Sequence, residues 1–185
     1  VNDTDAVRIY YSRLNGAELD SSDVRYYAEN AAGEITDLIL RDFTGDLYEY
    51  GIITSVSEQS DDMSLSGSYT YLLDGEKQTL TTSGKTLGAS YGPARLTIEN
   101  GQLASVRALS QIRNPDAITQ LGVTKDGESW LFSDECTVYL YQNTQYSLIS
   151  LTELRNNFAS YNITCYYDKD TDDGGRIRIV IARPQ

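Results

Sequence analysis

The segment Gly88-Ala89-Ser90-Tyr91-Gly92 matches the G-x-S-x-G pattern of a serine nucleophile elbow. In that motif the serine follows a strand and precedes a helix, and a histidine accepts its proton. This sequence contains no histidine, and the strand-like run 94–98 stands where the helix should begin. Serine–histidine and cysteine–histidine catalysis are therefore excluded, as are imidazole metal sites. We interpret Gly92-Pro93 as a turn.

Carboxylates are plentiful, because 27 of the 185 residues are Asp or Glu. Two carboxylates a few ångströms apart would suffice for a glycosidase, but so many acids offer too many pairs for the sequence to select one. A carboxylate-dependent hydrolase is therefore the last of three function hypotheses. We expect no catalytic, cofactor-binding or metal-binding residue, no cofactor and no enzyme activity.

The loop 168–175 contains Asp168, Asp170 and Asp172, whose alternate spacing is that of the opening of a calcium-binding loop. The pattern then breaks, because Asp173 stands at the position of the turn glycine and Ile179 at that of the closing glutamate. We interpret the segment as a solvated hairpin loop, with cation binding by the three aspartates as the alternative.

Two cysteines, Cys136 and Cys165, are the remaining reactive groups. Cys136 opens one predicted strand and Cys165 ends another, so a disulfide bond requires that these strands be neighbours. The alternative is a pair of buried thiols that behave as small apolar side chains, and we favour this second state.

Aromatic side chains could bind a ligand without catalysis. The sequence has 15 Tyr, three Phe and one Trp. Tyrosine combines an apolar ring with a polar tip, which suits half-buried strands, whereas exposed rings would suit a carbohydrate or a peptide. Alternation over residues 128–133 places Trp130 and Phe132 on one face and Leu131 on the other. We predict that Trp130 is mostly buried.

The formal net charge of −12 results from 27 acidic and 15 basic residues. It argues against nucleic acid or an anionic membrane as a partner, because phosphate binding requires a clustered basic face. No run approaches the ~20 apolar residues that cross a bilayer, so we expect no membrane insertion. Because the chain begins with Val1, we expect a processed product or a fragment whose targeting signal has been removed.

Turn signals indicate the elements that hold these residues. Asp74-Gly75, Asn100-Gly101 and Asp126-Gly127 separate runs rich in Val, Ile, Thr and Tyr, which predicts hairpins over 68–80 and 96–106. Short strands at such spacings are typical of an all-β sandwich or barrel. The serine-rich, acidic segment 55–68 is predicted to be a mobile surface loop.

One short helix is expected near residues 150–158. Ser150 can cap its N-terminus, with Glu153 at the capping-box offset. Leu151, Leu154 and Phe158 then fall on one face. This helix would lie between two strands of the last segment.

A pattern of runs occurs twice in the chain. Each copy has a β-type run, a Tyr-Tyr run, a polar loop, a glycine and a final β-type run. The first copy comprises residues 7–11, 24–27 and 33–40, and the second comprises 138–141, 164–167 and 175–181. If the copies are structural repeats, Tyr26, Gly33 and Ile35 should superpose on Tyr166, Gly175 and Ile177.

We therefore predict an all-β fold of duplicated small barrel- or sandwich-like modules with the one helix. The first copy of the module occupies residues 1–46, a middle β module occupies 47–112, and the second copy occupies 113–185.

Several of these segments resemble a known family. The segments 33–40, Thr44-Gly45-Asp46, Tyr50-Gly51-Ile52, Tyr166-Tyr167-Asp168 and 176–182 look like the β-rich C-terminal regions of bacterial cell-surface proteins that carry S-layer homology (SLH) domains. The likeness covers most of the chain, and its motifs are structural. It implies a secreted, extracellular, cell-wall-associated protein whose helical anchor repeats lie elsewhere. It implies no ligand and no site residues.

Three function hypotheses result. The first is a non-catalytic structural or adhesion module of a secreted bacterial cell-surface protein, with other domains of that protein or cell-wall components as partners. The second is a carbohydrate- or peptide-binding module that uses exposed tyrosines and Trp130, with a glycan or peptide as its partner. The third is the carboxylate-dependent hydrolase.

Overall fold

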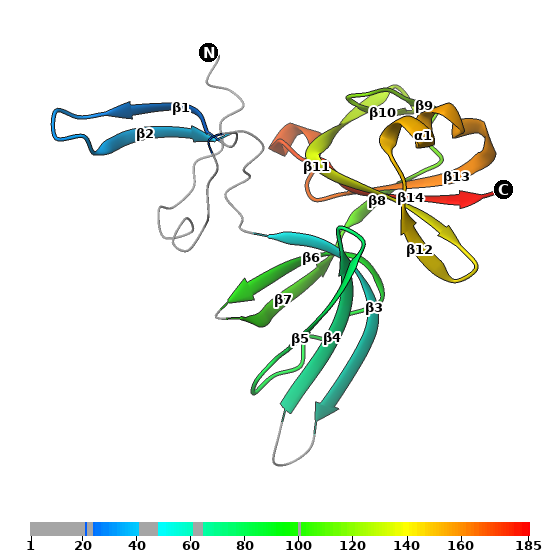
Figure 1. Ribbon diagram of the computed structural model, residues 1–185, viewed down its shortest axis with the longest axis horizontal. Helices are drawn as coiled ribbons and strands as arrows, with labels where there is room; N and C mark the ends of the chain where they lie inside the picture. Colours follow the sequence, from blue (N-terminus) through cyan, green and yellow to red (C-terminus); the bar gives the residue numbers. More distant parts are fainter. Residues whose placement is uncertain (1–20, 22–23, 41–47, 61–64, 100) are drawn as a thin grey trace. The chain divides into compact units, whose positions relative to one another are not determined.

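The computed structural model describes residues 21, 24–40, 48–60, 65–99 and 101–185. These residues form several β-sheets and one short α-helix (Figure 1), so the predicted all-β fold with one helix is confirmed. The chain divides into two compact units, residues 1–47 and 48–185. The predicted first run of the first copy, residues 7–11, lies outside the described residues.

The described part of the first unit is a two-stranded antiparallel hairpin of β1 (Val24–Glu29) and β2 (Ile35–Leu40). Asn30 organises the turn, because its side-chain Oδ1 accepts hydrogen bonds from the backbone N–H groups of Ala32 (2.9 Å) and Glu34 (3.0 Å). Gly33 has a φ of 78°, a left-handed conformation that glycine adopts without steric cost.

The second unit begins with a five-stranded antiparallel sheet in the order β5-β4-β3-β6-β7. Both predicted hairpins are confirmed: β4 pairs with β5, and β6 pairs with β7. Positive φ angles at Asp74 (49°) and Gly75 (81°) make the first of these turns tight. The strands are β3 (Glu49–Ser60), β4 (Leu65–Leu73), β5 (Glu76–Thr81), β6 (Gly92–Glu99) and β7 (Gln102–Ala108).

The predicted surface loop over 55–68 is wrong for most of its length. Residues 55–60 continue β3, residues 65–68 belong to β4, and the two segments pair with Val56 opposite Tyr69 and Ser60 opposite Leu65. Residues 61–64 lie outside the described residues. Serine and glutamate are tolerated here because the exposed ends of paired strands can carry polar side chains on both faces.

Tyrosines form much of the core of this sheet. Every second side chain of β4 points inward, so Tyr69 and Tyr71 are fully buried beside Leu96 and Leu103. Their polar tips remain bonded. The Tyr71 hydroxyl donates to Glu49 (3.2 Å) or Gln78 (3.1 Å), and the Tyr69 hydroxyl donates to Glu58. The tyrosine surplus therefore serves packing at these positions.

The second sheet has seven strands and follows the order β8-β13-β14-β11-β10-β9, with β12 also paired to β11. β14 pairs antiparallel with β13 and parallel with β11, and its residues 177–182 are all buried. The strands are β8 (Ser110–Arg113), β9 (Ala117–Ile118), β10 (Gly122–Lys125), β11 (Glu128–Gln142), β12 (Gln145–Leu148), β13 (Tyr161–Tyr167) and β14 (Ile177–Pro184).

The predicted helix is present as α1 (Leu151–Asn156), followed by a 3-10 turn at Phe158–Ser160. Ser150 is the N-cap, and its Oγ accepts a hydrogen bond from the Glu153 N–H (3.1 Å). Leu154 is fully buried in the core of the seven-stranded sheet, and Leu151 and Phe158 pack against the same cluster. The predicted apolar face of the helix is confirmed.

The two copies of the repeat share their antiparallel topology but not their register. Tyr26 lies opposite Ile39 in the first hairpin, whereas Tyr166 lies opposite Ile179 in the second. Ile179 corresponds in the sequence to Asp37, so the pairing differs by two residues. The predicted superposition of all three residue pairs is therefore wrong, although both segments form hairpins.

The two sheets of the second unit are joined through Leu109, the single residue between β7 and β8. Ile52 of β3 packs with Tyr139, Ile179 and Ile181 in a buried cluster shared by both sheets. The β4–β5 turn adds two hydrogen bonds, from Gly75 N–H to the Tyr139 hydroxyl (3.1 Å) and from Thr137 Oγ1 to Asp74 (3.0 Å). The predicted boundaries between the three modules, after residues 46 and 112, stay predictions.

Trp130 lies on the predicted face of β11. Trp130 and Phe132 pack against the core, whereas Leu131 is 46% exposed. Trp130 is mostly buried, as predicted: it packs against the core and lies opposite Val123 of β10, with its ring centroid 6.5 Å from that of Tyr167. The part of the chain that the structure describes contains no helix with the length and apolar character needed to span a bilayer.

Candidate functional site

A shallow pocket of about 300 Å³ opens beside the start of β13, and we call it the β13 pocket. None of its lining side chains carries a carboxylate, ammonium or guanidinium group, although the chain has a net charge of −12. The lining residues are Asn114, Pro115, Phe158, Ala159, Tyr161, Asn162, Ile163 and Gln185.

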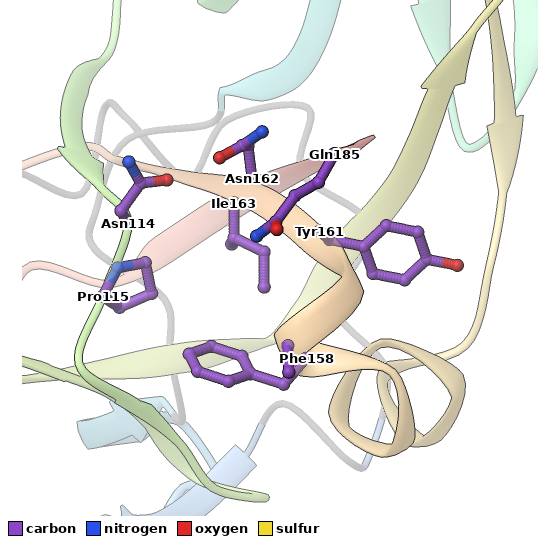
Figure 2. Close-up of a pocket in the computed structure, with 8 residues that line it drawn as sticks. Asn114, Pro115, Phe158, Tyr161, Asn162, Ile163 and Gln185 are labelled. Atoms are coloured by element: carbon purple, nitrogen blue, oxygen red, sulfur yellow. The ribbon is translucent and has the colours of Figure 1, made fainter.

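Backbone hydrogen bonds position the two sides of the β13 pocket. Asn114 N–H donates to the Ile163 carbonyl (2.7 Å), and Gln185 N–H donates to the Ser160 carbonyl (3.2 Å). Figure 2 shows the Phe158 ring lying near Pro115 and Ile163, whereas the Tyr161 ring points away from them. Pro115 and Ile163 are buried and form an apolar floor, and exposed amides surround it.

The second candidate is a buried ion pair between Asp168, which follows β13, and Arg178 of β14. Opposite Tyr166 and Tyr167, the β14 strand carries Ile179 and Ile177, so Arg178 is one extra residue in the ladder. Such a β-bulge re-aims a side chain, because the regular alternation of faces is interrupted. Arg178 is consequently buried and directed at Asp168, with its Nε 2.9 Å from Oδ2.

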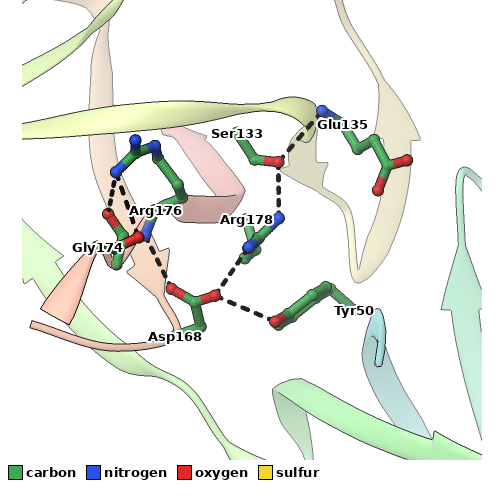
Figure 3. Close-up of polar contacts among 8 residues, drawn as sticks. Tyr50, Ser133, Glu135, Asp168, Gly174, Arg176 and Arg178 are labelled. Atoms are coloured by element: carbon green, nitrogen blue, oxygen red, sulfur yellow. Dashed lines mark hydrogen bonds and ion pairs between the residues drawn. The ribbon is translucent and has the colours of Figure 1, made fainter. Parts of the chain in front are cut away.

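Asp168 is bonded through both carboxylate oxygens (Figure 3). Oδ1 accepts from the Arg176 backbone N–H (2.8 Å), and Oδ2 accepts from Arg178 and from the Tyr50 hydroxyl (3.1 Å). The Arg178 guanidinium also lies 4.6 Å from the centre of the Tyr50 ring and donates to Ser133 Oγ (2.7 Å). We call Tyr50, Ser133, Asp168 and Arg178 the buried polar network.

A second irregularity places Ser133 in this network. Phe132 of β11 lies opposite Ile177 and Thr137 opposite Ile179, so four residues of β11 face the single residue Arg178. The extra length bends β11 locally and turns Ser133 inward, where it is buried. Because Tyr50 belongs to β3, the network connects the five-stranded sheet with the seven-stranded sheet.

The electrostatics of the network favour a charged Asp168. Burial by itself would raise the pKa of Asp168, but the charge of Arg178 and the hydrogen bonds from Arg176, Arg178 and Tyr50 hold that pKa below its ordinary value. For Tyr50, burial raises the pKa; Asp168 adds to the rise and Arg178 opposes it. At neutral pH the network therefore consists of a carboxylate, a guanidinium and a neutral phenol.

This arrangement also shows that Asp168 of the loop 168–175 is part of the buried polar network. Its side chain is 0% exposed and its oxygens accept hydrogen bonds from within the protein, whereas Asp170 and Asp172 are exposed. The three aspartates therefore do not present their carboxylates to one cation. Among the residues that the structure describes, no cluster of three or more potential ligands is found.

We predict that stability does not depend on calcium. Melting temperatures measured with calcium and with a chelator should agree within about one or two degrees, because a site occupied far above its Kd would add several kcal/mol. A calcium-dependent rise that disappears in Asp170→Ala would contradict this expectation.

Both cysteines are free thiols. Their strands β11 and β13 are separated by β14, so the condition for a disulfide bond, neighbouring strands, is not met. The expectation that Cys136 opens a strand is wrong, because β11 runs without a break from Glu128 to Gln142. Burial raises the pKa of Cys136 to about 12 against the opposing charge of Arg178. Burial also raises the pKa of Cys165, and the nearby Cys136 adds to that rise.

The folded protein should therefore resist thiol modification. We expect iodoacetamide at neutral pH to modify Cys136 and Cys165 at least about 100-fold more slowly in the folded chain than in urea, because the thiolate is the reactive form. Mass spectrometry of quenched samples measures both rates. Rapid modification of folded Cys136, or an intact disulfide bond, would show this expectation to be wrong.

Ser90 has no catalytic surroundings. It is exposed in the loop before β6, and a strand follows it where a nucleophile elbow needs a helix. The interpretation of Gly92-Pro93 as a turn is wrong, because both residues belong to β6 and lie opposite Ile53 and Ile52. Proline is accommodated there because it stands near the first residue of the strand.

Exposed aromatic residues occur in both units of the described chain. Tyr26 and Tyr27 are 54% and 55% exposed, but as adjacent residues of one strand they point to opposite faces. Tyr91 is exposed in the loop before β6, and Trp130 packs against the core of its sheet. Tyr26 and Tyr27 therefore do not share one face of their hairpin, and Trp130 contributes to packing within its own sheet.

In comparisons with protein-family models, with curated proteins and with solved structures, nothing matches this chain.

Sequence reasoning missed both candidate sites. Simple alternation along β14 does not predict the inward direction of Arg178, which depends on the extra residue in the ladder. One signal was present, since Arg178 is the only charged residue between Ile177 and Ala182 in an otherwise apolar strand, and a buried charge requires a partner. The β13 pocket has no comparable signal, because its residues come from three separate segments.

Proposed function

We propose that this chain is a non-catalytic structural or adhesion module of a secreted bacterial cell-surface protein, located outside the cell and associated with the cell wall. The observation that carries the proposal is the closed character of the buried polar network. The side chains of Asp168 and Arg178 are only 0% and 5% exposed. Their hydrogen-bonding groups are directed at one another and at Tyr50 and Ser133 rather than at solvent.

The Asp168 side chain is 0% exposed, so a substrate cannot reach its carboxylate as a base or nucleophile. The network connects β11, β14 and the residue that follows β13 with Tyr50 of the other sheet. It lies beside the apolar cluster of Ile52 and Tyr139, so polar and apolar contacts act on the same junction. A module that keeps two sheets in one arrangement suits a structural role.

The location and partners are proposed from the sequence segments that resemble the β-rich regions of SLH-domain proteins. The partners would be other domains of the same surface protein or components of the cell wall. The high negative charge supports a solvated, self-repelling surface. Neither the strands nor the network requires a cofactor.

Protease treatment of intact cells tests the proposal. The bacterium that encodes the full-length product would carry either the wild-type gene or Asp168→Ala, and peptides from residues 48–185 would be quantified before and after lysis. We expect the wild-type module to be reached by external protease yet cleaved slowly, and the variant to be cleaved much faster. Cleavage only after lysis would contradict a surface location.

The control variant is Lys125→Ala, which breaks the exposed ion pair with Asp116 and leaves the hydrogen bond from Asp126 N–H to Asp116 in place. It should be cleaved at the wild-type rate, because an exposed pair contributes little to stability. If Asp168→Ala also keeps the wild-type cleavage rate on intact cells, the network does not serve the integrity of the module, and the structural proposal loses its main support.

A further inference from the structure

We propose that the β13 pocket binds a neutral sugar residue, either free or at the end of a glycan. This inference goes beyond the proposed structural role and does not depend on it. It rests on the charge, the polar groups and the apolar floor of the pocket, and on the backbone pairing of β13.

The side chains that line the pocket favour a neutral ligand over an ionic one. No Asp, Glu, Lys or Arg side chain is among the eight lining residues, while the protein as a whole would repel anions. The ligand should therefore be neutral and should use hydrogen bonds rather than ion pairs.

The polar groups at the rim are amides. Asn114 and Asn162 are exposed, and within the described residues no hydrogen bond to the protein is formed by their side chains. Each amide offers two N–H donors and one carbonyl acceptor. A sugar hydroxyl both donates and accepts, so it matches either end of the amide.

The floor of the pocket is apolar. The partly buried ring of Phe158 and the buried side chains of Pro115 and Ile163 can pack against the C–H face of a sugar ring. An apolar surface with a few convergent polar groups is the usual composition of a small-molecule site, and about 300 Å³ is at the small end of such sites. One sugar residue therefore suits the pocket better than a long oligosaccharide.

A peptide is the less suitable occupant, because the backbone of β13 is already engaged at this point. The Ile163 carbonyl accepts from Asn114 N–H, and Tyr161 N–H donates to the Phe158 carbonyl. On its other side β13 pairs with β14, with Asn162 opposite Arg183. A peptide that binds by strand addition needs free backbone groups at a sheet edge.

Nuclear magnetic resonance titration of the complete chain tests the inference. The ¹⁵N-labelled protein would be titrated separately with glucose, galactose and N-acetylglucosamine, and with glucuronate and trialanine as charged and peptide probes. For at least one neutral sugar we expect saturable shifts at Asn114, Phe158 and Asn162, with a Kd on the order of millimolar. Saturation by none of the three sugars, saturation away from the pocket, or binding of trialanine alone would overturn the proposal.

Two amide variants add a second test. Asn162→Ala removes one amide from an exposed position, and Asn114→Gly removes the other while tolerating the φ of 47° at this residue. Each should raise the Kd about 5- to 10-fold. Gln145→Ala, which removes an exposed amide from β12, is the matched control and should leave the Kd unchanged. Equal Kd values for Asn162→Ala and Gln145→Ala would overturn the assignment, and Trp130 fluorescence confirms that each variant is folded.

Discussion

Replacement of Asp168 by alanine should lower the free energy of unfolding by about 3–5 kcal/mol, because it leaves the charge of Arg178 buried without its carboxylate. The Arg178 side chain is only 5% exposed, so water cannot replace the lost partner without opening the junction between the sheets. Urea denaturation followed by Trp130 fluorescence measures the loss.

Three controls separate the buried charge from other effects. Lys125→Ala breaks a surface ion pair with a separation of 3.0 Å and should change the unfolding midpoint far less. Asp168→Asn keeps the size of the side chain and should still be strongly destabilising. The double variant Asp168→Leu with Arg178→Met should recover much of the loss, because it removes both charges. A loss in Asp168→Ala no larger than that in Lys125→Ala would contradict the argument.

The same pair predicts an acid-sensitive stability. The pKa of folded Asp168 lies below its ordinary value of 3.8, so the unfolded chain binds a proton at a pH where the folded chain does not. The stabilisation is therefore complete above about pH 5 and is lost as the pH falls through the folded pKa. The wild-type unfolding free energy should fall more steeply below about pH 4 than that of Asp168→Asn. If the unfolding free energies of the two proteins fell equally steeply with decreasing pH, the prediction would be contradicted.

Truncation of Tyr139 should be equally costly, about 3–5 kcal/mol for Tyr139→Ala. The side chain is 1% exposed and packs with Ile52 of the five-stranded sheet and Ile179 and Ile181 of the other. Its ring also makes an edge contact with Tyr146, at 6.0 Å between centroids. The variant leaves a cavity at the junction, and hydrogen exchange should show reduced protection in both sheets.

Tyr139→Phe is the matched control. It keeps the ring and removes only the hydroxyl that accepts from Gly75 N–H, so it should cost about 0.5–1.5 kcal/mol. If the alanine and phenylalanine variants are destabilised equally, the hydrogen bond rather than ring packing controls this junction, and the cavity argument is wrong.

Local signals in the sequence determined which segments form strands, turns and the helix, and several of the residues at which these elements begin or end. Asp74-Gly75 and Asp126-Gly127 form tight turns with positive φ angles because these residue types tolerate that backbone conformation. Ser150 caps α1, and the spacing of Leu151, Leu154 and Phe158 puts them on the buried face. Such features depend on neighbours in the chain, so sequence reasoning reaches them.

The polar composition of segment 55–68 led to the wrong prediction of a surface loop. Serine and glutamate suggested a loop, but β3 and β4 pair through residues 55–60 and 65–70. Backbone hydrogen bonds between strands do not depend on side-chain polarity, and an exposed ladder needs no apolar face along its whole length.

The candidate sites were decided by tertiary structure alone. The extra residue in β14 and the extra length of β11 turn Arg178 and Ser133 inward, and Tyr50 meets them from a strand more than 80 positions earlier. The β13 pocket likewise combines the segments around Asn114, Phe158 and Gln185. Amino-acid order specifies which strands and turns can form. Register, bulges and the packing of one sheet on another decide which distant side chains meet, because these depend on contacts between residues far apart in the chain.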